Sequence, residues 1–176
     1  MNMYHLRFEN QRIQQDEVFN LLVYHHLERC YISPKIFYIY YIYNSGNTRT
    51  RFIPDRFDIY KSVREHFEEL KNFWSLIDKR LDDYLEKRFY TGVIQCMLFN
   101  LTHPNCKWTK QQKKDEMERI MTDPLTIQCF KYAETHERRL EQLLYRKACK
   151  NQSLFQIKLV TSVFGIFHKM RRLLKK

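Results

Sequence analysis

The chain has 176 residues, of which 44% are hydrophobic, and it contains only three glycines and four prolines. This length suits one domain with a hydrophobic core, the apolar fraction argues against a disordered chain, and glycine-rich phosphate-binding loops are excluded. The net charge is +11, and residues 107–176 hold 17 Lys and Arg against 7 Asp and Glu, so this basic third is expected to face an anionic partner.

The five cysteines are an odd number without close paired spacing, which fits neither a disulfide framework nor a zinc ribbon. A reducing compartment suits them best. The opening MNMYHLRFENQ lacks the apolar core of a signal peptide, and no apolar stretch approaches the roughly 20 residues that span a bilayer. We therefore expect a cytoplasmic protein, either soluble or peripheral on the inner face of the plasma membrane.

Before residue 52 the pattern predicts two strands around one helix. Residues 4–8 are a candidate short strand, and YISPKIFYIYYIY (31–43) is dense in the β-branched and aromatic residues that favour strands. Between them, residues 16–27 follow helical spacing, with Asp16 and Glu17 in the first turn.

From residue 54 onward the sequence predicts helices. The first begins near 54–58, and its heptad seam indicates a face that packs along a partner helix. Beyond residue 88 its apolar stripe shifts, and the segment 101–109 ends it. The seam consists of Val63, Phe67, Leu70, Trp74, Ile77, Leu81 and Tyr84. A second helix begins after Thr109, a suitable N-cap, and ends at Asp123-Pro124. Residues 125–150 form a third helix and 153–176 the last one.

The last segment is basic and amphipathic. It contains no acid, and its six cations are Lys158, Lys169, Arg171, Arg172, Lys175 and Lys176. At helical spacing its apolar face comprises Leu159, Val160, Val163, Phe164, Ile166, Phe167, Met170 and Leu174. This pattern is typical of a helix that lies in a membrane interface with its cations at anionic head groups. The alternative is a helix that packs on its own domain with a solvated basic face. Nucleic acid is not an expected partner, because no binding motif is visible.

Residues 6–50 resemble the acceptor-side end of the catalytic domain of family 2 glycosyltransferases, which have the GT-A fold. Gln15-Asp16-Glu17 correspond to the acidic motif, Phe19 to the aromatic residue after it, and residues 38–43 to the tyrosine-rich stretch. The resemblance implies that Asp16 is the general base that accepts the proton of the acceptor hydroxyl. It also implies substrate-binding roles for Glu17, Tyr41, Tyr43, Thr48 and Arg49.

The chain departs from that family in several ways. Gln15 replaces the usual glutamate, and Tyr43-Asn44 stand where an arginine is expected. The Asp-x-Asp that holds a metal ion on the nucleotide diphosphate is absent, so no metal site is expected in this chain, and Mg²⁺ or Mn²⁺ only in a full-length enzyme.

These features predict a mainly α fold with a small β element. Residues 1–52 would be the end of a GT-A domain, 53–152 a helical extension and 153–176 the basic amphipathic helix. The expected function is that of a C-terminal glycosyltransferase fragment, inactive alone. The full-length enzyme would transfer a sugar from a nucleotide sugar to a saccharide or lipid-linked acceptor in cell-surface polysaccharide synthesis. The alternative is a non-enzymatic basic helical module that binds a membrane surface or a partner protein.

Overall fold

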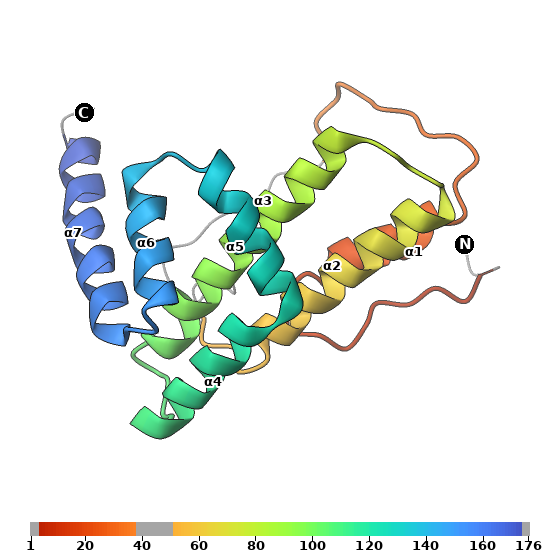
Figure 1. Ribbon diagram of the computed structural model, residues 1–176. Coiled ribbons are helices and arrows are strands. Elements are labelled where there is room, and N and C mark those ends of the chain that lie inside the picture. Colours follow the sequence, from red (N-terminus) through yellow and green to blue (C-terminus); the bar gives the residue numbers. More distant parts are fainter. Residues whose placement is uncertain (1–3, 38–50, 174–176) are drawn as a thin grey trace.

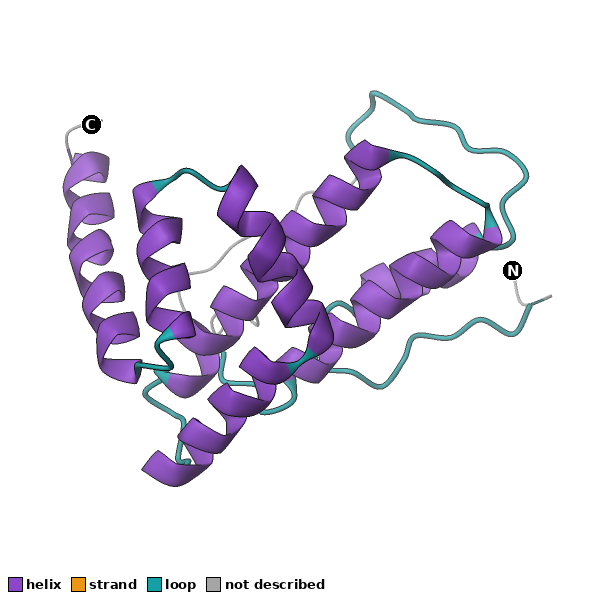
Figure 2. Cartoon of the chain, in the orientation of Figure 1, coloured by secondary structure: helices purple, strands orange, loops and turns teal. Residues whose placement is uncertain are grey.

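The computed structural model describes residues 4–37 and 51–173, and the regular structure within these ranges is entirely helical (Figures 1 and 2). The elements are α1 (Gln15–Tyr24), α2 (Arg56–Phe73), α3 (Lys79–Cys96), η1 (Met97–Leu101), α4 (Lys110–Thr122), α5 (Pro124–His136), α6 (Leu140–Lys150) and α7 (Leu154–Leu173). The short η1 segment is a π-helical turn that continues α3. The expectation of a mainly α fold is confirmed.

The expected β element is absent from the described residues. Residues 4–8 and 31–37 are irregular, and 38–43, the rest of the second expected strand, lie outside the described ranges. The apolar side chains of 31–37 lack the neighbours that a strand needs, because Tyr31, Ile32, Ile36 and Phe37 are all at least 79% exposed. A GT-A domain is built around a sheet. The resemblance to family 2 glycosyltransferases is therefore wrong, and the described part of the N-terminal segment is instead loop, helix and loop.

Helix α3 lies at the centre of the molecule (Figure 1), where it contacts α2, α5 and α6. Phe89, Tyr90 and Val93 of α3 are buried in a cluster with side chains from α2, α4, α5, α6 and α7. A second, smaller cluster joins α1 to α2 through Val18, Leu21 and Val63. The helix expected at 16–27 is thus confirmed, and its apolar stripe packs on α2.

The single long helix expected from 54–58 to the segment 101–109 is in fact α2 and then α3 with η1, and α2 and α3 form an antiparallel hairpin. Ser75 takes a left-handed conformation with φ of 50°, and the Leu76 N–H donates to the Lys71 carbonyl at 2.9 Å, which closes α2 as a Schellman motif does. Trp74 is 46% exposed and Ile77 fully exposed, so the heptad seam is interrupted and is not one packed face.

The next two helix boundaries follow the sequence more closely. Thr109 caps α4 in a capping box with Gln112, as its position predicted, and Asp123 caps α5, which begins at Pro124. The helix expected over 125–150 is divided into α5 and α6. Between them, the Glu137 carboxylate accepts a hydrogen bond from the Arg139 backbone N–H at 3.1 Å, a side-chain contact that supports a turn without Gly or Pro.

Candidate functional site

Helix α7 forms one edge of the molecule, where it lies beside α6 (Figure 1) and contacts η1. Ile157 is fully buried, and Leu154 and Val160 pack against the main core. The Tyr145 hydroxyl of α6 donates a hydrogen bond to Thr161 Oγ1 at 3.3 Å, and burial raises the pKa of that tyrosine. One side of α7 is therefore fixed to the bundle.

A second side of α7 carries large apolar side chains that do not pack on the bundle. They follow one another at steps of four, four, three, one and three residues, so they form a continuous stripe along the helix. We call these residues the α7 stripe: Phe155, Leu159, Val163, Ile166, Phe167 and Met170, which are between 49% and 75% exposed.

The structure divides the apolar face that the sequence predicted. Val160 and the half-buried Phe164 point to the bundle side, whereas Leu159 and Val163 are exposed. One arc of α7 thus packs on the domain and another is left open, whereas contact with a membrane interface stays a prediction. Sequence reasoning missed Phe155 in the stripe, although its spacing of four from Leu159 was a usable signal.

Cations accompany the α7 stripe. Lys158 and Arg171 are exposed and make no ion pair within the described ranges. Lys158 precedes Leu159 by one residue, which places it about 100° around the helix, beside the stripe. His168 faces the bundle, where its Nε2 lies 3.2 Å from Glu141 Oε2 of α6. The side chains of Lys169 and Arg172, and residues Lys175 and Lys176, lie outside what the structure describes.

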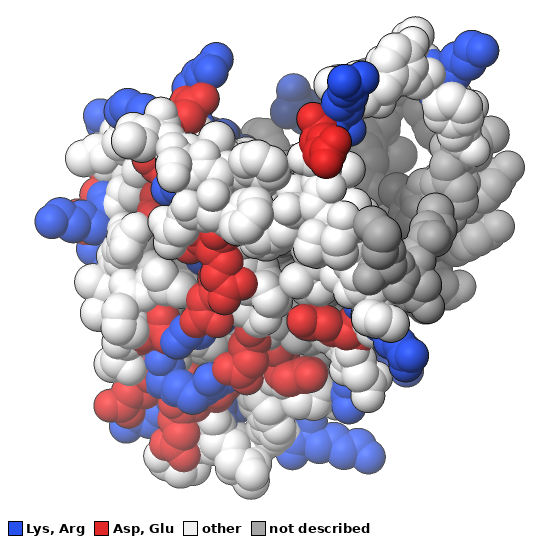
Figure 3. All heavy atoms as spheres, turned by 90° about the vertical axis from the view of Figure 1, so that its right-hand side faces the viewer, with Lys and Arg blue, Asp and Glu red and all other residues white. Residues whose placement is uncertain are grey.

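The end of the molecule away from α7 has a different charge pattern. Figure 3 shows acidic and basic side chains lying side by side over part of that face, mainly at its lower left. Acids and bases of the bundle form ion pairs with each other, such as Lys71 with Asp82 between α2 and α3. The last 24 residues, by contrast, hold six cations and no acid. Six of the eleven net positive charges of the chain therefore belong to the segment that also presents the α7 stripe.

Of the residues expected in an acceptor site, only Asp16 and Glu17 lie within the described ranges. Asp16 is exposed on the first turn of α1, whereas Glu17 forms an ion pair with Arg88 of α3 and so fixes α1 to the bundle. The remaining expected substrate-binding residues lie outside the described ranges; they are Tyr41, Tyr43, Thr48 and Arg49. The role of Asp16 as a general base rested on the family resemblance, which the helical fold has overturned.

Comparisons with known proteins identify no relative. No family model, no curated protein and no solved structure matches this chain. Among the described residues, no helix combines the length and the apolar character needed to cross a bilayer, and no group of three or more His, Cys, Asp or Glu is placed to hold a metal ion. The exposed apolar stripe and the cations of α7 are the surface features that bear on function.

Proposed function

We propose that this protein is a non-enzymatic helical module that binds an anionic membrane surface through α7. The α7 stripe carries the proposal, since six large apolar side chains stay exposed along a helix that is already packed on the bundle. Exposed apolar patches of this kind mark interaction sites. A helix fixed parallel to the molecular surface can lie flat in the interface, with its stripe among the acyl chains and its cations at the head groups.

The apolar contribution is large enough for reversible binding. Full burial of an aliphatic or aromatic side chain contributes about 1.5–3 kcal/mol. Since the stripe residues are about half to three-quarters exposed, transfer of the exposed part contributes on the order of 5–10 kcal/mol before the cost of ordering the complex.

Charge complementarity selects a lipid surface as the partner. The segment 153–176 has no acid that an anionic leaflet would repel, and each cation near such a leaflet contributes about 1 kcal/mol. The cytoplasmic leaflet of the plasma membrane carries anionic lipids, and the five cysteines are free, which suits a reducing cytoplasm. A groove on a partner protein would need its own acidic rim to match these cations.

The proposal is tested by flotation of the purified protein with phosphatidylserine-containing vesicles. Ile166→Asp introduces a carboxylate into the α7 stripe, and Ile127→Asp makes the same change at a similarly exposed isoleucine of α5. The Ile166 variant loses the transfer of one apolar side chain into the bilayer, which costs at least roughly 1.4 kcal/mol of binding free energy. It should therefore bind at least about tenfold more weakly. The Ile127 variant should bind like the parent protein.

A second pair of variants tests the charge contribution. Lys158→Gln with Arg171→Gln should weaken binding to anionic vesicles by about 30-fold and leave binding to pure phosphatidylcholine vesicles unchanged. Lys110→Gln with Lys114→Gln removes two exposed cations of α4 and serves as the matched control. If the two double variants bind anionic vesicles equally, or if neither isoleucine variant differs from the parent protein, α7 is not the membrane contact.

A further inference from the structure

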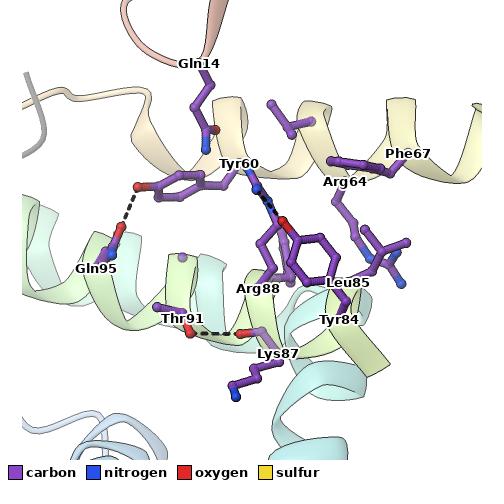
Figure 4. Close-up of a pocket in the computed structure, with 13 residues that line it drawn as sticks. Gln14, Tyr60, Arg64, Phe67, Tyr84, Leu85, Lys87, Arg88, Thr91 and Gln95 are labelled. Atoms are coloured by element: carbon purple, nitrogen blue, oxygen red, sulfur yellow. Dashed lines mark hydrogen bonds between the residues drawn. The ribbon is translucent and has the colours of Figure 1, made fainter. Parts of the chain in front are cut away.

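A cavity of about 450 Å³ lies between α2 and α3, beneath the turn that precedes α1 (Figure 4). Small-molecule binding sites have volumes of about 300–1,000 Å³, so a ring system fits here. Most of the lining is apolar or aromatic, and this part comprises Tyr60, Val63, Phe67, Tyr84, Leu85 and Phe89. The cavity therefore suits a ligand with a flat apolar body.

The cations among the described lining residues leave no charge for a ligand. Arg64 is buried and pairs with Glu86 at 2.9 Å. Arg88 donates through one terminal nitrogen to Glu17 and through the other to a tyrosine hydroxyl at 3.1 Å. The ammonium group of Lys87 points away from the cavity in Figure 4. A charged ligand would lose its hydration here without gaining a counter-ion, so the cavity selects neutral ligands.

The side-chain amide of Gln14 is the polar group that remains for a ligand. Gln14 extends toward the Tyr60 ring in Figure 4, and its Oε1 is buried without a hydrogen-bond partner. Its backbone has φ of 58°, a left-handed conformation that is uncommon outside glycine and that occurs at ligand contacts. A half-turn of the amide exchanges its N–H and C=O ends, and a hydroxyl both donates and accepts. A ligand hydroxyl can therefore satisfy this amide.

The Tyr60 ring is held as one wall of the cavity. A Cβ on Gly92 would lie 3.2 Å from this ring, so the glycine allows the ring to rest against the α3 backbone. The Tyr60 hydroxyl donates to Gln95 Oε1 at 2.7 Å, which fixes the far end of the side chain. Burial raises the pKa of Tyr60, so the phenol stays neutral at physiological pH and adds no charge to the cavity. The wall is therefore flat, fixed and uncharged.

From this geometry we infer that the α2–α3 cavity binds a small neutral aromatic ligand that carries a hydroxyl group. The ring of the ligand lies beside the Tyr60 ring, and its hydroxyl pairs with the Gln14 amide. This site is separate from the α7 stripe and does not depend on membrane binding.

Two probes with the same ring system test this inference. At pH 7, 2-naphthol is neutral and carries the hydroxyl, whereas 2-naphthoate carries a carboxylate in its place. In a titration followed by ¹H–¹⁵N correlation spectra, 2-naphthol should produce saturable shifts of the amides of Thr91 and Gly92, which line the cavity. The carboxylate of 2-naphthoate would lose hydration without gaining a counter-ion, so this probe should bind at least about tenfold more weakly.

A pair of variants tests the contact with Gln14. Gln14→Met removes the amide at a similar side-chain volume and should weaken 2-naphthol binding roughly fivefold, through the loss of one neutral hydrogen bond. Gln111→Met makes the same change at an exposed glutamine of α4 and should leave the affinity unchanged. The same spectra report whether each variant keeps the native fold.

Four results would overturn the inference. Millimolar 2-naphthol leaves the Thr91 and Gly92 amides unshifted, or its shifts map to 154–173 instead. Alternatively, 2-naphthoate binds as tightly as 2-naphthol, or a folded Gln14→Met variant binds 2-naphthol like the parent protein.

Discussion

The buried ion pair between α2 and α3 gives the sharpest prediction of stability. Arg64 Nη2 donates to Glu86 Oε1 at 2.9 Å, and the two side chains are only 6% and 11% exposed. Gln128 of α5 donates to the same carboxylate, so Glu86 joins three helices. Glu86→Gln preserves the volume and removes the charge. Arg64 then keeps only Glu68, whose side chain is 37% exposed, as an ionic partner.

Removal of one partner of a buried pair typically costs 3–5 kcal/mol, and the remaining Glu68 contact should reduce this to about 2–3 kcal/mol. Urea unfolding measures the change directly, and the melting temperature should fall by roughly 4–12 °C. Arg64→Met with Glu86→Met should recover most of the loss, because neither charge is then left buried. Asp83→Asn, at an exposed ion pair of α3, should leave the melting temperature unchanged. If Glu86→Gln is as stable as the parent protein, water solvates Arg64 and Glu86 in the folded state, and the pair is not buried.

Three further predictions concern single sites. Thr109→Ala removes the N-cap of α4 and should destabilise the protein by about 0.5–2 kcal/mol in urea unfolding, whereas Thr109→Ser should be close to neutral. Iodoacetamide should label Cys30 quickly and Cys106 more slowly in the native protein. The three buried thiols should react only after unfolding, because burial raises their pKa. Rapid labelling of all five thiols in the native protein would show that these three cysteines are not buried. Arg139 lowers the pKa of Glu137 to about 2, so this carboxylate stabilises the fold above its ordinary pKa of 4.5, and the contribution is lost as the pH falls toward 2. The difference in melting temperature between the parent and Glu137→Gln should therefore shrink from pH 7 to pH 3; a constant difference would contradict the pairing.

The helical periodicity and the caps could be predicted from the sequence, because they depend on neighbours along the chain. Thr109 and Asp123-Pro124 have the side chains that start and stop helices, and α7 has an obvious amphipathic pattern. The break at Ser75 could not be predicted in this way, since a serine in the left-handed conformation replaces the usual glycine.

The strand prediction was wrong over the described residues 31–37 for a different reason. β-propensity reflects packing against neighbouring strands, and in the described residues 31–37 no neighbour is present. The family resemblance depended on the same stretch and was wrong with it. The sequence also could not predict which arc of α7 packs on the bundle. Val160 and Val163 are chemically identical, and only the positions of α6 and η1 decide that Val160 packs and Val163 stays exposed.

The most direct test of membrane binding is to measure which face of α7 enters the bilayer. In a background with Cys30→Ser and Cys106→Ser, an environment-sensitive fluorophore is attached at Val163→Cys or, as a control, at Ile127→Cys; both parent positions are about half exposed. On addition of phosphatidylserine-containing vesicles, the label at position 163 should shift to the blue and become accessible to a lipid-soluble quencher, while the label at 127 stays in water. Equal responses at the two positions, or no response at 163, would contradict the assignment of the α7 stripe as the membrane-binding surface.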